Sequence, residues 1–156
     1  MTPTPSQTVG PFFGFALPFE EDAEAVTAGA EGAIRIEGQV LDGAGEPVPD
    51  ALLEVSQGEQ FARCLTNVEG AFHFTVVKPA AADGAPFLHV TVFARGLLRH
   101  LSTRLYFPDE SDANDSDPVL RLVDAARRST LVARRDGEVL RFDVRLQGED
   151  ETVFFE

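Results

Sequence analysis

The feature that most constrains the fold is an alternation of apolar and polar residues in runs too short for helices. In residues 140–148, LRFDVRLQG, Phe142, Val144 and Leu146 alternate with charged residues. A period of two places alternate side chains on opposite faces of a strand, so this run predicts a half-buried strand. Comparable runs predict strands at residues 33–41 and 51–57. Two more are predicted before and after the turn Asn67–Gly70, the second of which ends at Val77. A further two are predicted within residues 87–107, separated at Arg95 and Gly96.

The fold class that follows is all-β, an antiparallel β-sandwich of about seven short strands separated by turn signals. Only residues 116–135, SDPVLRLVDAARRSTLVARR, have helical character. A cap at Ser116 or Asp117 and the following proline predict the start of one short helix. Ser129 and Thr130 are expected to end it and to precede an extended piece.

The first 32 residues have a different character and are expected to form an N-terminal arm and an acidic linker. The stretch TPSQTVGPFF, residues 4–13, contains two prolines and a glycine, which predict irregular backbone, but also apolar residues that favour an ordered arm. Residues 20–32, EEDAEAVTAGAEG, are expected to be a solvated linker. Residues 33–156 would then form the sandwich, with one domain overall.

Composition narrows the classes of partner. The formal net charge is −13, which argues against binding to nucleic acid or to an anionic membrane. No run of 18 apolar residues occurs, and the N-terminus does not resemble a signal peptide. A single cysteine, Cys64, excludes an internal disulfide and fits a reducing cytoplasm.

Few residues in this chain could carry chemistry on their own. The histidines are His73, His89 and His100, and the single tyrosine is Tyr106. His89 alternates with Phe87 and Thr91, a setting in which a histidine is expected to be a satisfied core residue. The absence of HxH, HExxH and CxxC spacings predicts that the chain has no self-contained metal site. Taken alone, these residues indicate a β-sandwich without a visible catalytic constellation.

Several stretches in order nevertheless resemble the intradiol ring-cleavage dioxygenases, and among them the α subunits of heteromeric members that cleave protocatechuate. They are TPSQTVGPF, GQVLDGAGEPVPDALLEVSQ, GAFHFTVVKP, HVTVFARGLLRHLSTRLYFPDE and RFDVRLQGEDETVFFE. The resemblance implies a non-haem Fe(III), held by two tyrosines and two histidines in the active subunit. It also implies cleavage of protocatechuate with O₂ to 3-carboxy-cis,cis-muconate.

This chain departs from the ligand set that the resemblance implies. One tyrosine is expected after the strand ending at Gln57, where the sequence runs through Gly58, Glu59 and Gln60 to Phe61. The second is expected after Lys78-Pro79, where residues 80–83 are AAAD. The H-x-H pair is replaced by Phe87-Leu88-His89, and Tyr106 matches a non-ligand tyrosine. The segment after Gln57 is also short, so the resemblance implies an iron-free α subunit that completes the active site of a homologous, iron-bearing β subunit.

The resemblance assigns substrate-binding roles to Thr8, Gly10 and Pro11 in the arm and to Arg95 in the FARG turn. The arm would lie against the β subunit and shape a wall of its pocket, and the Arg95 guanidinium would attract an anionic aromatic acid. Two plainer interpretations stay open. Gly10 and Pro11 could make a turn that places Phe12 and Phe13 in the core of this chain, and Arg95 could be an ordinary exposed turn residue.

Two other functions compete with this one. The turn-rich segment from Gly38 to Val55, followed by TNVEGAFHFTV, also resembles transthyretin-like and carboxypeptidase-regulatory-like sandwiches, which predicts a standalone binding module. A third possibility is an active hydrolase or dioxygenase whose site has no recognisable motif. The N-terminal TPSQTVGPFF and the C-terminal GEDETVFFE favour the dioxygenase subunit, because binding modules of this kind do not require them.

Overall fold

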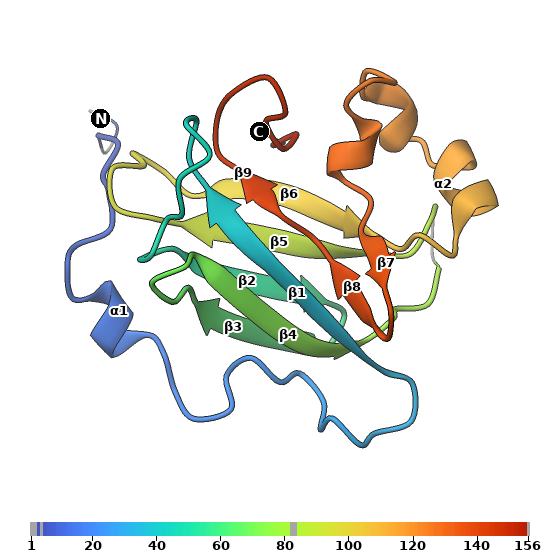
Figure 1. The fold of residues 1–156 in the computed structure, drawn as a ribbon, viewed down its shortest axis with the longest axis horizontal. Coiled ribbons are helices and arrows are strands. Elements are labelled where there is room, and N and C mark those ends of the chain that lie inside the picture. The colour runs from blue at the N-terminus through green and yellow to red at the C-terminus, as the bar shows by residue number, and fades with distance from the viewer. Residues whose placement is uncertain (1–2, 4, 82–83, 156) are drawn as a thin grey trace.

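Two β-sheets packed face to face form the body of the protein in the computed structural model, which describes residues 3, 5–81 and 84–155 (Figure 1). The predicted β-sandwich is therefore confirmed. Parts of the predicted arm (Met1, Thr2, Thr4) and of the segment after Lys78-Pro79 (Ala82, Asp83) lie outside the described residues, as does Glu156. The first sheet has the order β4 (Ala71–Val77), β1 (Ala33–Leu41), β8 (Val139–Arg141), β7 (Arg134–Asp136), and β9 (Val144–Arg145) pairs with β1. The second has the order β3 (Gln60–Leu65), β2 (Leu52–Gln57), β5 (Phe87–Phe93), β6 (Leu101–Tyr106).

The final predicted strand is two strands, β8 and β9, which both pair with β1 and are separated at Phe142 and Asp143. All strand pairs are antiparallel except β1 with β8 and β1 with β9, which are parallel. Between β8 and β9, the Phe142 backbone N–H donates to the Glu37 carbonyl at 2.9 Å, and the Asp143 carboxylate accepts from the Gln39 N–H at 3.1 Å. A Cβ on Gly38 would lie 1.9 Å from the Phe142 carbonyl oxygen, so only glycine permits this close approach of the two backbones.

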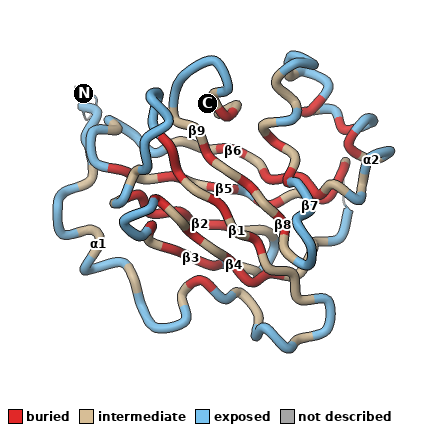
Figure 2. The backbone as a smooth tube through the Cα atoms, in the orientation of Figure 1, coloured by how far each residue is buried: buried red, intermediate tan, exposed pale blue. Residues whose placement is uncertain are grey.

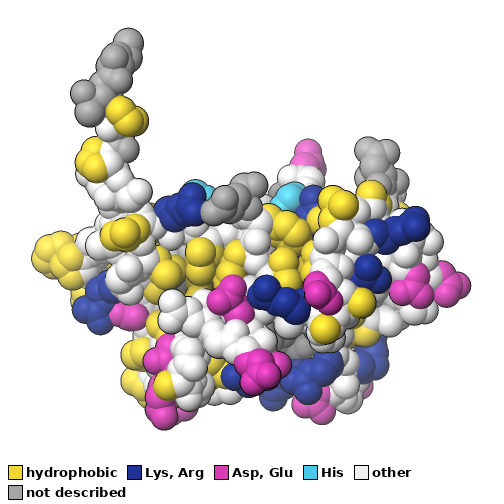
Figure 3. Space-filling view, turned by 90° about the horizontal axis from the view of Figure 1, so that it is seen from above, with side chains coloured by type: hydrophobic (Ala, Val, Ile, Leu, Met, Phe, Trp, Pro, Cys, Tyr) yellow, Lys and Arg dark blue, Asp and Glu magenta, His cyan; other side chains and the backbone are white. Residues whose placement is uncertain are grey.

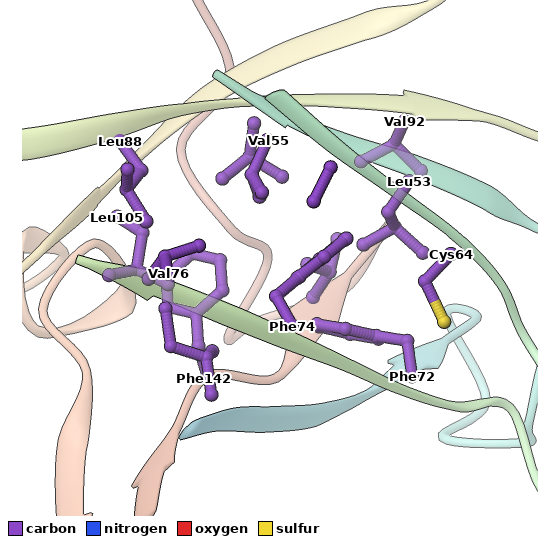
Figure 4. Packing of buried hydrophobic residues seen from close by; sticks show 14 of the residues in the cluster. Leu53, Val55, Cys64, Phe72, Phe74, Val76, Leu88, Val92, Leu105 and Phe142 are labelled. Atoms are coloured by element: carbon purple, nitrogen blue, oxygen red, sulfur yellow. The ribbon is translucent and has the colours of Figure 1, made fainter. Parts of the chain in front are cut away.

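The core lies between the two sheets and is made of alternate residues from each strand. Phe72, Phe74 and Val76 of β4 face Leu53, Val55 and Leu88 of the second sheet, as the close-up in Figure 4 shows. All six are at most 4% exposed. Buried residues concentrate along the strands in Figure 2, whereas the arm is mostly exposed. Burial of one face of each strand is the pattern expected from the period of two.

The short helices are not where the sequence predicted them. A helix α2 spans Ser111–Ser116 and ends at the residue where one was expected to begin, and only the 3₁₀ turns η1 (Leu120–Leu122) and η2 (Arg128–Thr130) follow. Pro118 explains why α2 ends at Ser116, because a residue before proline avoids helical backbone, and Asp117 is extended. The Asp117 carboxylate still caps the next turn by accepting from the N–H groups of Val119 and Leu120, each at 2.9 Å.

The arm and the linker are also more structured than predicted. One turn of helix, α1 (Phe13–Ala16), follows Pro11 directly, and the Phe13 N–H donates to the Gly10 carbonyl. In the linker, Ala23 is buried, and the backbone of Ala23 and Ala25 exchanges hydrogen bonds with Thr75 at the edge of β4. The edge strand supplies unpaired backbone groups, so part of the linker pairs with it instead of being solvated throughout. Among the described residues, no helix has the length and apolar character needed to cross a membrane.

Candidate functional site

The three segments that the resemblance connects with metal ligands meet at one hollow on the second sheet. Gln57 at the end of β2, Ala80 after Lys78-Pro79 and Phe87 at the start of β5 all line it. Its volume is about 290 Å³, and Arg104 and Asp117 complete the wall. Residues separated by up to 60 positions in the sequence are thus brought together because β2, β5 and β6 are neighbours in the sheet.

A satisfied polar network lies behind this hollow. The buried Asp117 carboxylate accepts the Tyr106 hydroxyl at 3.2 Å and the Ala85 N–H at 3.1 Å, besides its two cap contacts. The Arg104 guanidinium donates to the Tyr106 oxygen at 3.1 Å and lies over the Phe87 ring, 4.0 Å from its centroid. Burial raises the pKa of the Tyr106 phenol, so it stays protonated and donates to Asp117.

The side chains at this hollow do not fit a ferric ion. Hard ferric iron requires anionic or imidazole donors, and the three segments offer one of these, the imidazole of His89, besides the amide of Gln57, the methyl of Ala80 and the phenyl ring of Phe87. Tyr106, the single tyrosine, has no exposed surface, and the two hydrogen bonds of its hydroxyl hold it to Arg104 and Asp117. Across residues 3, 5–81 and 84–155, no three His, Cys, Asp or Glu side chains are grouped closely enough to hold a metal ion.

The prediction that His89 is a core residue was wrong. Leu88 and Val90 point into the core, so His89 lies on the outer face of β5, where it is exposed. Its ring packs edge-on against Phe87, with centroids 4.9 Å apart. Partial desolvation, and secondarily the Arg104 charge, lower the pKa of His89, which keeps the imidazole neutral near pH 7.

The residues assigned to substrate binding lie at a second place, where the arm meets the turn between β5 and β6. The Gly96 N–H donates to the Thr8 hydroxyl at 3.1 Å, which ties the arm to the FARG turn directly beside Arg95. Arg95 is 61% exposed, and its Nε donates to the Asp50 carboxylate. We call Thr8, Gly10, Pro11, Asp50 and Arg95 the arm corner; next to it lies a hollow of about 380 Å³ lined by Gln7, Thr8, Val9, Phe93, Ala94, Leu97, Leu98, Arg99 and His100.

The arm presents its apolar side chains to the surface. Phe12 and Phe15 are 75% and 85% exposed and Phe13 is only half-buried, so the interpretation that the turn places Phe12 and Phe13 in the core of this chain is wrong. Gly10 and Pro11 are exposed, and a Cβ added to Gly10 would meet no heavy atom within 4 Å. Figure 3 shows part of the arm projecting from the body of the protein. Exposed aromatic residues on a tethered segment are typical of a surface that another chain covers.

Sequence reasoning did not find three of the residues that build these two places. Asp117 was predicted only as a helix cap, and neither Asp50 nor Arg104 was singled out. Asp50 lies in the turn before β2, and its role depends on a contact with Arg95, 45 residues away. Arg104 lies in β6, and its role depends on packing against the neighbouring strand β5. No local pattern in the sequence signals such contacts.

Comparison with known proteins identifies close relatives over the whole chain. The chain is 44% identical to the protocatechuate 3,4-dioxygenase alpha chain of Burkholderia cepacia, with 98% of this chain and 96% of the relative covered. It is 38% identical to the alpha chain of Pseudomonas putida at the same coverage. The alignment with the first runs over 191 positions, more than the 156 residues of this chain, so the relative contains segments that this chain lacks. No family model matches the chain.

The beta chain and solved structures give the same picture. The Burkholderia cepacia protocatechuate 3,4-dioxygenase beta chain is 28% identical over 76% of this chain and 66% of its own length. The dioxygenase domain of a dioxygenase and carbohydrate-binding fusion from Streptomyces sp. SirexAA-E is 27% identical, with a TM-score of 0.66 and coverage of 94% and 99%. Hydroxyquinol 1,2-dioxygenase from Pseudomonas putida DLL-E4 shares the fold, with a TM-score of 0.57. It is 18% identical, and the match covers 93% of this chain and 66% of that protein.

These relatives argue against a standalone binding module, because such a module would not be 44% identical to an alpha chain over 98% of this chain and 96% of the relative. The chain therefore belongs to the protocatechuate 3,4-dioxygenase alpha chains of the intradiol ring-cleavage dioxygenase family.

Proposed function

We propose that this chain is the non-catalytic alpha subunit of a protocatechuate 3,4-dioxygenase and completes the active site of a homologous beta subunit. The observation that carries the proposal is the contrast between the two places just described. The segments expected to bear four metal ligands offer only one suitable donor, the imidazole of His89, whereas the arm corner presents an exposed arginine and a tethered arm. Alpha and beta chains are both among the relatives, which supports a hetero-oligomer.

The Fe(III) of the complex would belong to the beta subunit, where it activates the bound catecholate toward O₂. This chain would contribute through Arg95, whose guanidinium donates hydrogen bonds to the carboxylate of protocatechuate. Such a contact positions the ring and favours substrate over uncharged catechols. Because the whole chain carries a net charge of −13, a local cation also offsets the repulsion that an anionic substrate meets.

The arm would act by position and by exclusion of water. The hydrogen bond from Gly96 to Thr8 fixes the arm beside Arg95, so Gly10 and Pro11 leave the surface at a defined point. Glycine lets the backbone approach a partner closely, and proline limits the conformations of the next turn. The exposed Phe12 and Phe15 would be buried against the beta subunit. We place this complex in the cytoplasm, which agrees with the single unpaired cysteine.

The test is to purify the chain alone, the beta subunit alone and the two after co-expression. Iron content, visible phenolate-to-iron absorption and O₂-dependent cleavage of protocatechuate are measured in all three. The proposal expects a colourless and inactive alpha chain and a coloured, active complex that purifies as one species. Ring cleavage by this chain without a partner would refute it, and so would full activity of the beta subunit alone.

A further inference from the structure

The arm corner contains a carboxylate whose role is not explained by folding. Asp50 lies at the end of the turn between β1 and β2, and its only hydrogen bond among the described side chains is with the Nε of Arg95. The two side chains are 28% and 61% exposed, so this ion pair contributes little to stability. A pair of this kind can instead fix the direction of a flexible side chain.

Asp50 is attached to rigid backbone. The neighbouring Ala51 is fully buried, its N–H donates to the Thr66 hydroxyl at 2.9 Å, and its carbonyl accepts the Thr66 N–H at 2.8 Å. The Thr66 hydroxyl also donates to the Val48 carbonyl at 2.8 Å, which fixes the turn on the other side of Asp50. The carboxylate is therefore a fixed acceptor, while Arg95 has several rotatable bonds.

The way in which the pair forms leaves the useful edge of the guanidinium open. Asp50 accepts from Nε, and within the described residues no hydrogen bond involves Nη1 or Nη2 of Arg95. Those two groups carry the parallel N–H donors that bind a carboxylate in a bidentate manner. A single anchor on Nε leaves these donors without a hydrogen-bond partner among the described residues, one residue before the Gly96 to which Thr8 is bonded.

We propose that Asp50 is a positioning residue that orients Arg95 for the carboxylate of the aromatic acid. This inference rests on the proposed role of Arg95. Two effects of Asp50 oppose each other, because its negative charge also repels the anionic substrate. That repulsion acts through water and is screened further by salt, whereas an arginine without its anchor loses more side-chain freedom on binding, so orientation is the larger effect.

The experiment measures kcat and KM for protocatechuate in the assembled complex. Asp50→Ala is expected to raise KM about three- to tenfold with kcat unchanged, and Asp50→Glu, which can still accept from Nε, should restore most of the affinity. Glu46→Ala is the matched control, since it removes the same charge from an exposed position of the same turn. Glu46→Ala should leave KM unchanged or lower it slightly. Thermal unfolding of each isolated variant checks that the chain remains folded.

A double-variant cycle separates this inference from the proposal beneath it. Asp50→Ala added to Arg95→Ala should raise KM no further, because the residue that Asp50 orients is gone. If Arg95→Ala raises KM and Asp50→Ala does not, or lowers it, the positioning role is overturned and the role of Arg95 stands. An unchanged KM in Arg95→Ala overturns both. An equal rise for Asp50→Ala and Glu46→Ala would indicate a general effect of charge and also overturn the inference.

Discussion

The hollow lined by Gln57, Ala80 and Phe87 and the arm corner lie on the same sandwich. They differ in how many of their polar groups already have hydrogen-bond partners. At the hollow, Asp117 is 2% exposed and accepts four hydrogen bonds, and Tyr106 and Arg104 are tied to it in a chain. At the arm corner, the Arg95 guanidinium has one hydrogen-bond partner among the described residues, and the arm exposes aromatic rings. A satisfied buried network resists binding because each new contact must break an old one, whereas an open edge does not.

The comparison supports the proposal that this chain contacts substrate and partner at the arm corner. At the hollow, the polar groups named above are already bonded to one another and to the backbone. Each prediction below would weaken or sharpen that division.

The largest effect is expected at the hollow. Asp117→Ala removes the acceptor of three backbone N–H groups and of the Tyr106 hydroxyl, leaving buried donors unpaired. It should lower the free energy of unfolding by about 3–5 kcal/mol, measured by urea denaturation of the isolated chain. Asp115→Ala, an exposed acidic neighbour, should change it by less than about 0.5 kcal/mol. A loss below 1 kcal/mol in Asp117→Ala would show that the hollow does not depend on this network.

Gly10→Val should affect the complex and spare the isolated chain. A side chain at Gly10 meets no atom of this chain within 4 Å, so thermal unfolding of the chain should be unchanged. In the complex, the added bulk should reduce turnover about tenfold or more, or prevent co-purification, since packing at an interface tolerates little extra volume. Gly29→Val in the linker, which also has no neighbour within 4 Å, is the control and should be silent. If the complex with Gly10→Val assembles and turns over normally, the arm is merely structural.

Arg95→Ala should weaken substrate binding without changing metal content. Loss of a charge-assisted hydrogen bond of about 1.5 kcal/mol corresponds to an approximately tenfold higher KM for protocatechuate, with kcat and iron retained. Arg121→Ala removes a cation from an exposed position elsewhere and should have no such effect. Equal changes in the two variants would remove Arg95 from the pocket.

The smallest effect is expected from His89→Gln. Burial lowers the pKa of His89 in the folded chain, so the unfolded chain binds the proton first as the pH falls. The contribution of His89 to stability is complete above pH 6.5 and is lost at lower pH, and the variant should slightly flatten the fall in stability between pH 7 and 5. Iron content and activity of the complex should be unchanged. Loss of iron in this variant would mean that the hollow binds metal.

Much of the fold could be predicted because the residues of the core alternate with polar residues along each strand. The strand expected at residues 33–41 is β1, and β2, β4, β5 and β6 fall within the predicted runs. The split between β8 and β9 could not be predicted. It depends on the close approach of the Phe142 backbone to Gly38, which is more than 100 residues away in sequence. The predicted cap at Asp117 does form, but it begins only the 3₁₀ turn Leu120–Leu122, and the helix α2 lies before it.

The candidate site was predictable only where a motif carried it. The SQTVGPF and FARG motifs indicated Thr8, Gly10, Pro11 and Arg95, whose roles in substrate binding stay predictions, as does the division of the chain at residue 32. Their neighbour Asp50 had no motif, because an ion pair between two turns leaves no local pattern. His89 was misjudged since parity alone does not tell which face of a strand is buried.

The most direct test of this account is the iron stoichiometry of the purified, fully active complex. Metal analysis combined with quantification of each chain gives the number of iron ions per alpha and beta pair. The account predicts one iron per pair, retained when the alpha chain carries His89→Gln. Two iron ions per pair, or iron bound to the alpha chain after the subunits are separated, would contradict it and would place a metal site in this chain.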